Sequence, residues 1–329
     1  MPVSFTFCNQ KGGVGKTTLS FHLAHFLNQL GKKVLVVDLD GQGNISSRLA
    51  ENLTPGCYRT RHLFEQKLKP ATILNTESGI DLIYANDGDE ELHAVERMDL
   101  KVIGDFSNNL STLAADYDFV IIDTPPAPGV KLYAGVCVAE HIYVPVELSA
   151  FAVSGVSQII RSFGVLSRSL DTEIRCAGII INKFNNRVDS HHQAMEEIRA
   201  NIGNLIMRCQ LVNRGTLDNA LTHGKPVWDL RSTGAQRETG YEMVDLMEEI
   251  CLKAGIDTKS HPTKLHPRPQ LKIKPKSPAP SAKADLKIKA VAKPSAKSAA
   301  KSVAKPAPKA VKVARQQSAT AKPVKVKRS

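Results

Sequence analysis

The sequence contains no C-x-x-C pair, although it has six cysteines. Zinc sites generally need closely spaced cysteine or histidine ligands, so the spacing excludes this class of metal protein. Most of the six lie in apolar runs, which predicts buried thiols in a protein from a reducing compartment. They are Cys8, Cys57, Cys137, Cys176, Cys209 and Cys251.

Long apolar runs are also missing. No run approaches the roughly 18 apolar residues of a transmembrane helix. No basic-then-apolar leader precedes the first predicted strand. We therefore expect a soluble, cytoplasmic protein with no membrane partner.

Acidic and aromatic residues are scarce at the C-terminal end. Residues 257–329 contain 20 Lys+Arg against 2 Asp+Glu, a charge of +18, whereas residues 1–256 contain 24 against 30, a charge of −6. The basic segment has no Phe, Tyr, Trp or Cys, and such a composition cannot bury enough apolar area to offset the entropy of ordering. We predict a globular domain over 1–256 and a disordered basic tail over 257–329. This asymmetry indicates nucleic acid or another anionic surface as a partner.

A glycine-rich segment lies between a predicted strand at 3–8 and a predicted helix at 19–30. Glycines let backbone N–H groups turn inward around an anion, and a helix N-terminus adds further donors. The segment therefore predicts a phosphate-binding loop, in which Lys16 lies against the β- and γ-phosphates and the Thr17 hydroxyl holds Mg²⁺. The residues expected to bind the nucleotide are Gly12, Gly13, Val14, Gly15, Lys16, Thr17 and Thr18.

Further apolar runs alternate with helical patterns. Continuous apolar runs suit parallel strands that are covered on both faces. We predict an α/β fold in which a mostly parallel, twisted sheet has helices on both faces and binds its ligand at the carboxyl ends of the strands. The predicted strands are 33–38, 80–85, 119–122, 141–146, 175–181 and 205–211, and the predicted helices after the first are 61–68, 89–97, 106–115, 154–167 and 235–254.

Carboxylates follow two of these strands. Asp38 and Asp40 are two residues apart at a strand end, so their side chains point to the same side, toward the ligand crevice. Asp123 ends the apolar run at 119–122, which is the Walker B arrangement whose carboxylate meets Mg²⁺. These residues predict an Mg²⁺-dependent nucleotide site.

The strand at 175–181 is followed by Asn182-Lys183-Phe184-Asn185, which looks like the N-K-x-D base-reading site of GTPases. Asn185 stands where that site has an aspartate. A carboxylate accepts both ring-edge N–H donors of guanine, and an amide does so less well. The pattern therefore disfavours GTP and leaves ATP as the expected nucleotide.

Four motifs, in this order, resemble the ParA/MinD family of ATPases with a deviant Walker A loop, and the resemblance covers about residues 1–256. The phosphate loop has the form KGGVGKTT, with Lys11 just before the glycine pair. The segment at 38–44 is similar to D-x-D-P-Q-G-N, with Gly41 in place of the proline. The other two are D-T-P-P at 123–126 and H-G-K-P at 223–226.

The resemblance implies an Mg²⁺-dependent ATPase that forms a homodimer on binding ATP. It implies that Lys11 reaches the partner's nucleotide and that Asp40 positions or activates the attacking water. The residue matching Asp38 supports the Mg²⁺ shell in this family, and an asparagine near Asn182 contacts adenine. The expected catalytic residues are thus Lys11, Lys16 and Asp40, with Thr17, Asp38 and Asp123 at the metal.

The resemblance also implies non-specific DNA binding at the nucleoid and stimulation by a ParB-like or cargo-adaptor protein. Such proteins partition or position plasmids, chromosomes or protein complexes. Arg187 matches one DNA-binding arginine of the family, while the second position is occupied by Thr216, so the nearest basic residue, Arg214, is the candidate replacement. The basic tail offers a further DNA contact, because neutralising phosphates needs no fold.

Three alternatives remain open. A MinD-like ATPase cycles on membranes through a C-terminal amphipathic helix, but this tail has no aromatic residues and several prolines. An iron–sulfur reductase on the same fold needs a cysteine soon after Walker B, whereas Cys137 lies 14 residues after Asp123. The third is a structural DNA-binding protein whose ATP only gates dimerisation.

Overall fold

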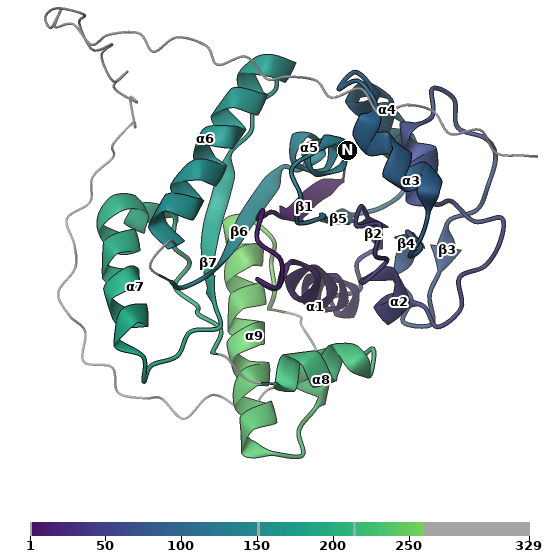
Figure 1. Cartoon of the computed structure of the whole chain (residues 1–329). Coiled ribbons are helices and arrows are strands. Elements are labelled where there is room, and N and C mark those ends of the chain that lie inside the picture. Colours follow the sequence, from purple (N-terminus) through teal and green to yellow (C-terminus); the bar gives the residue numbers. More distant parts are fainter. Residues whose placement is uncertain (1, 150–151, 213–214, 260–329) are drawn as a thin grey trace, which may run out of the picture. The chain divides into compact units, whose positions relative to one another are not determined.

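The computed structural model describes residues 2–149, 152–212 and 215–259. Seven strands lie in this part of the chain: β1 (Val3–Phe7), β2 (Val34–Asp38), β3 (Leu74–Asn75), β4 (Asp81–Ile83), β5 (Phe119–Asp123), β6 (His141–Glu147) and β7 (Cys176–Asn182). They form one sheet in the order β3-β4-β2-β5-β1-β6-β7 (Figure 1). All neighbours are parallel except β3, which is antiparallel to β4 at the edge. The predicted mostly parallel sheet is confirmed.

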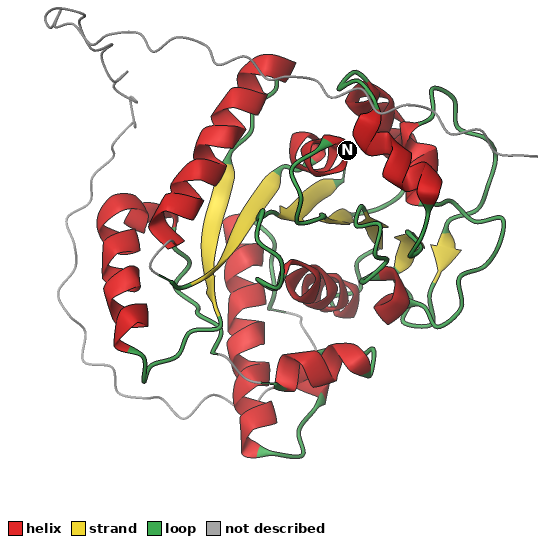
Figure 2. Cartoon of the chain, in the orientation of Figure 1, coloured by secondary structure: helices red, strands yellow, loops and turns green. Residues whose placement is uncertain are grey.

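Helices cover both faces of this sheet, as predicted (Figure 2). Successive side chains of a strand point to opposite faces, so in β5 Ile121 joins one apolar core while Val120 and Ile122 join another. The first face is covered by α1 (Lys16–Gln29), α2 (Ser46–Leu49), α8 (Thr216–Thr222) and α9 (Gly234–Lys253). The second is covered by α3 (Glu90–Ala94), α4 (Val102–Leu113), α5 (Val130–Val138), α6 (Ala152–Leu170) and α7 (Asp189–Ile202).

Short 3-10 helices complete the connections between these elements. The helix predicted over 61–68 is one of them, and it is shorter than expected. The helix predicted over 89–97 is divided between α3 and a 3-10 turn. The 3-10 segments are Thr60–Phe64, Val95–Arg97, Gly203–Leu205 and Val227–Asp229.

The strand predicted over 205–211 is wrong. This segment runs beside β7, but only the N–H groups of Met207 and Leu211 donate to β7 carbonyls, at 2.9 and 3.0 Å. Between them, the N–H groups of Arg208 and Cys209 donate to the two carboxylate oxygens of Glu249 on α9, at 2.8 and 2.9 Å. A buried side chain therefore takes the donors that a regular ladder would need.

None of the described helices is long and apolar enough to cross a bilayer. The segment predicted to be a tail begins at Asp257, and its residues from 260 onward lie outside the described part of the chain.

Candidate nucleotide-binding site

The glycine-rich segment forms the loop between β1 and α1. Gly13 and Gly15 have backbone φ angles of 73° and 96°, in the left-handed region that favours glycine. α1 begins at Lys16, so the free N–H groups of its first turn lie at this loop. Loop and helix end together make the anion-binding arrangement that the sequence predicts.

Asn182, at the end of β7, holds the other side of this loop. Its amide Nδ2 donates to the carbonyl of Val14 at 2.7 Å, and its Oδ1 accepts from the N–H of Lys183 at 2.8 Å. A Cβ atom at Gly15 would lie 2.4 Å from Nδ2, so no larger residue fits there without a shift. Asn182 therefore fixes the shape of the loop. This contact with the loop was not part of the prediction, which assigned Asn182 to adenine.

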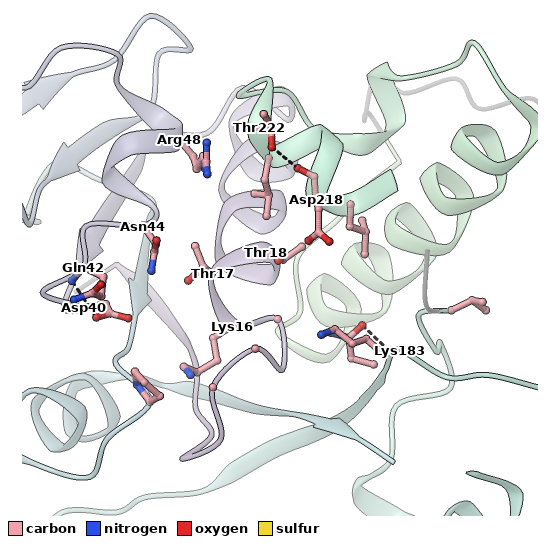
Figure 3. A pocket seen from close by; sticks show the side chains of 18 residues that line it. Lys16, Thr17, Thr18, Asp40, Gln42, Asn44, Arg48, Lys183, Asp218 and Thr222 are labelled. Atoms are coloured by element: carbon pink, nitrogen blue, oxygen red, sulfur yellow. Dashed lines mark hydrogen bonds between the residues drawn. The ribbon is translucent and has the colours of Figure 1, made fainter. Parts of the chain in front are cut away.

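A cavity of about 570 Å³ opens in front of the loop, and Figure 3 shows the side chains around it. Its walls come from the loop and the start of α1, the segment after β2, the end of β7, and α8. The predicted residues that line it are Gly12, Gly13, Gly15, Lys16, Thr17, Thr18, Asp40 and Asn182. Residues that the sequence did not single out also line it, among them Gln42, Asn44, Arg48 and Asp218.

Thr17 and Asp123 meet behind this cavity. The Thr17 hydroxyl donates to Asp123 Oδ2 at 2.7 Å, and the hydroxyl of Ser20, one turn along α1, donates to Oδ1 at 3.0 Å. Asp123 is fully buried. Burial raises the pKa of its carboxyl to about 6, although the two hydroxyls and the Lys16 charge act in the opposite direction. The group therefore carries a buried charge that a nearby cation would stabilise.

The donor set suits a magnesium ion. Mg²⁺ prefers oxygen ligands and usually keeps several waters beside one or two protein groups and substrate phosphates. Thr17 and Asp123 supply such oxygens. The described residues contain no cluster of three or more His, Cys, Asp or Glu able to hold a metal. A cation here would thus complete its shell with phosphate and water oxygens.

Asp38 lies beside Asp123, because the two residues are register partners on the adjacent strands β2 and β5. Its carboxylate accepts three hydrogen bonds, from the hydroxyl and N–H of Ser46 at 2.6 and 3.1 Å and from the N–H of Asp40 at 3.0 Å. Burial and the neighbouring Asp123 raise its pKa well above the usual range. Asp38 is therefore a buried anchor for the segment that carries Asp40. Ser46 had no signal in the sequence beyond its place just after the carboxylate motif.

Asp40 lines the cavity, as Lys16 does. In Figure 3, Lys16 and Thr17 extend from the start of α1 toward the wall on which Asp40 and Gln42 lie. Asp40 Oδ1 accepts from the N–H of Gln42 at 3.2 Å. Burial lowers the pKa of Lys16, while Asp123 and Asp40 oppose that shift.

Like the buried Val14, Lys11 does not line the cavity. Its side chain is 57% exposed, and its Nζ lies 3.0 Å from Glu147 Oε2 at the end of β6. The structure therefore places Lys11 at the rim, outside the phosphate site of its own chain.

Of the two predicted DNA-binding arginines, Arg187 does not line this cavity. Arg187 is exposed in the loop between β7 and α7, and its N–H donates to Asn185 Oδ1 at 3.0 Å. Arg214 falls outside the described residues. Its replacement of the family arginine missing at Thr216 stays a prediction.

Sequence comparisons relate the chain to chromosome partitioning proteins. The AAA domain family matches residues 4–176. The chromosome partitioning protein ParA of Caulobacter vibrioides is 30% identical over 241 residues, which cover 69% of this chain and 88% of that protein. The chromosome-partitioning ATPase Soj of Treponema pallidum is 28% identical over 270 residues, covering 78% and 99%.

Solved structures show the same fold. The ATP complex of a Cyanothece McdA variant has a TM-score of 0.66 at 21% identity, covering 78% of this chain and 97% of that one. A plasmid partition protein of Borrelia burgdorferi bound to AMPPNP has a TM-score of 0.60 at 21% identity, covering 77% and 100%.

Proposed function

The chain belongs to the ParA family of ATPases, and from that premise we propose that it partitions or positions cargo as an ATP-bound homodimer on DNA. Its similarity to chromosome partitioning proteins supports this proposal. The cargo is a plasmid, a chromosome or a protein complex. We place the protein at the nucleoid in the cytoplasm, with a ParB-like or adaptor protein as its stimulating partner.

One observation carries the nucleotide chemistry: the buried Asp123 carboxylate is hydrogen-bonded to Thr17 directly behind a glycine loop that opens on a cavity. In our proposal the loop N–H groups and Lys16 hold the ATP phosphates, and Thr17 and Asp123 hold Mg²⁺. When bound, Mg²⁺ neutralises charge on the β- and γ-phosphates. Asp40 orients the attacking water, and Asp38 keeps the Asp40 segment in place.

The position of Lys11 supports a role toward a second subunit. Its side chain is largely exposed and lies outside its own cavity. Beside it, an added Cβ at Gly12 would meet no atom within 4 Å in the single chain. A requirement for glycine at this position would thus have to come from another molecule close to the loop.

For DNA, we propose contacts from the exposed Arg187, from Arg214 and from the basic segment after residue 259. The charge of +18 on residues 257–329 supports electrostatic, sequence-independent binding.

The proposal is tested by light scattering and DNA binding under three conditions: no nucleotide, ADP, and a non-hydrolysable ATP analogue with Mg²⁺. We expect a dimer only with the analogue and similar affinities for unrelated duplexes. The Lys16→Ala variant should not bind the analogue, because the main phosphate charge is removed. A chain that stays monomeric with the analogue, or that binds guanine nucleotides more tightly than adenine nucleotides, would refute the proposal.

A further inference from the structure

We infer that Glu147 is a positioning residue that holds Lys11 on its own subunit and so opposes its use at the nucleotide of a partner. The inference rests on the proposed function, because it assigns Lys11 a role across a dimer. Its starting point is the ion pair between Lys11 Nζ and Glu147 Oε2, at 3.0 Å.

This ion pair is the last of three contacts that join the phosphate loop to β6. The N–H of Cys8 donates to the carbonyl of Tyr143 at 2.9 Å. The amide Nδ2 of Asn9 then donates to the carbonyl of Pro145 at 2.7 Å. The partners on β6 are two residues apart, and Glu147 follows at the same interval. The start of the loop therefore runs along β6, and the side chain of Lys11 extends this line of contacts.

The backbone of Lys11 is fixed in the same direction. Its N–H donates to Asn9 Oδ1 at 2.9 Å, so the two polar atoms of the Asn9 amide join the Lys11 backbone to β6. The side chain of Lys11 is bound only at its end, and its 57% exposure leaves room to rotate. Lys11 can thus leave Glu147 without disturbing the loop that holds the phosphates.

Glu147 lies in a basic environment, and part of this environment remains when Lys11 moves away. The hydrogen bond from Lys11 is the main cause that lowers the pKa of Glu147, and the charges of Lys11, Lys183 and His191 add to it. Once Lys11 moves away, the charge of Lys183 still acts on the carboxylate. The ion pair can therefore break without leaving Glu147 uncompensated.

The size of the effect follows from exposure. The side chain of Glu147 is 33% exposed, so this is a surface ion pair, and such pairs shift an equilibrium by about 1.5- to 5-fold. Salt screens exposed charges, with a Debye length of about 10 Å at 0.1 M and about 3 Å at 1 M. The influence of Glu147 on dimerisation should accordingly be modest and become smaller at high salt.

The test compares Glu147→Gln with Glu140→Gln, an equal loss of charge at an exposed carboxylate just before β6. Dimer dissociation constants are measured by analytical ultracentrifugation with a non-hydrolysable ATP analogue and Mg²⁺, at about 0.05 and 0.5 M salt. We expect Glu147→Gln to dimerise about 1.5- to 5-fold more tightly than the unaltered chain at low salt, and the difference to be smaller at high salt. Glu147→Ala should shift in the same direction, and Glu140→Gln should match the unaltered chain.

Each other outcome overturns the inference. Weaker dimerisation of Glu147→Gln would mean that Glu147 prepares Lys11 for the partner instead of withholding it. A shift that is undiminished at high salt, or that Glu140→Gln reproduces, would indicate a structural or general charge effect. If the unaltered chain itself fails to dimerise, the proposed function fails. Equal constants for the unaltered chain and Glu147→Gln remove only the role of Glu147.

Discussion

Two carboxylates at the end of β2 occupy different environments, although only one residue separates them. Asp38 is buried and accepts three hydrogen bonds, whereas Asp40 lines the cavity and accepts a single one from the backbone of Gln42. Removing the Asp40 side chain should therefore leave the fold and ATP affinity intact. If it orients water, Asp40→Ala should lower the rate of hydrolysis by about 10²-fold or more.

The measurement is single-turnover hydrolysis together with equilibrium binding of a fluorescent ATP analogue. Asp218→Ala is the matched control, because it removes a carboxylate that lines the same cavity from α8. It should keep most of the hydrolysis rate. Near-normal turnover by Asp40→Ala would remove this residue from the mechanism.

Two buried histidines on α1 give the protein a predictable sensitivity to acid. His22 bridges two segments: its Nδ1 lies 2.6 Å from the Thr18 carbonyl, and its Nε2 accepts from the N–H of Val227 at 3.1 Å. His25 packs against Phe21 with ring centres 4.4 Å apart and the ring planes tilted by 55°, and its buried Nε2 has no hydrogen-bond partner within the described chain. Burial lowers the pKa of His22 to about 4 and that of His25 to about 3.

Since both values lie below the ordinary histidine value of about 6.5, the unfolded chain takes up these protons first as the pH falls. The stability they contribute is present above about pH 6.5 and is lost toward pH 4. At pH 5 each histidine should lower the free energy of unfolding by about 2 kcal/mol relative to pH 7.5. His25→Leu should thus lose about 2 kcal/mol less than the unaltered chain on this shift.

Urea denaturation at pH 7.5 and pH 5 gives this difference. His192→Gln, which alters an exposed histidine, should follow the unaltered chain. The opposite dependence of the buried carboxyls Asp38 and Asp123, whose raised pKa values favour the folded state at low pH, is common to all three proteins and cancels in the comparison. An equal loss in His25→Leu would contradict the prediction.

At the scale of elements, the strands that sequence predicts well are those buried on both sides. β2 and β5 are continuous apolar runs, and such a run predicts a strand covered on both faces without any knowledge of the neighbouring strands. β3 has only two residues, too few for any period to show. α5 is apolar nearly all round, so it has no clear amphipathic stripe. The buried stripe of α7 is narrow and consists of only Ala194, Met195 and Ile198.

Residues 205–211, where the predicted strand is absent, are held in their irregular conformation by one residue distant in the sequence. Glu249 is 7% exposed and accepts the N–H groups of Arg208 and Cys209 on its two oxygens. In Glu249→Gln one of these oxygens becomes an NH₂ group, which leaves a donor facing a donor. We expect the free energy of unfolding to fall by about 1–3 kcal/mol. The exposed neighbour variant Glu248→Gln should stay within about 0.5 kcal/mol.

Denaturant unfolding of both variants measures the change in the free energy of unfolding. Hydrogen exchange shows where the structure is weakened, since the amides of Arg208 and Cys209 should lose protection before those of β7. Equal stability of Glu249→Gln and Glu248→Gln would show that water replaces the carboxylate without cost.

For the whole molecule, the sheet order brings together residues that are distant in the chain. β1, β5 and β2 are neighbours, so the loop at Lys16 and the carboxylates Asp123 and Asp38 meet at one edge. Each of these groups was predicted from its own strand-end motif. That they lie at the same edge was predicted because the carboxyl ends of parallel strands meet at one edge of the sheet. The partners Ser20, Ser46 and Asn9 could not be predicted, because a hydroxyl or amide gains its role only when a neighbouring strand delivers an acceptor.

The charge of the molecule is divided between two parts, and this leads to a prediction for DNA binding. Residues 260–329 keep 19 Lys+Arg against 1 Asp+Glu, a charge of +18, while residues 1–259 carry 25 against 31, a charge of −6. A net negative domain should bind DNA weakly by itself, so most of the non-specific affinity should come from the basic segment. A protein shortened after Lys259 keeps Ile256, whose N–H donates to Cys251 and whose side chain packs on the core.

If the basic segment contacts about 6–10 phosphates, the affinity of the full chain should fall roughly 10³- to 10⁵-fold between 50 and 200 mM salt, because each contact releases a counterion. The shortened protein should bind much more weakly and show a shallower salt slope, while ATP binding and dimerisation persist. The full chain should also keep DNA binding with ADP, since phosphate contacts of this kind do not depend on the nucleotide. Fluorescence anisotropy on one random duplex across a salt series measures all of these. Equal affinities and equal slopes for the two proteins would instead assign DNA binding to Arg187 and Arg214, and would leave the basic segment as a tether or a site for another partner.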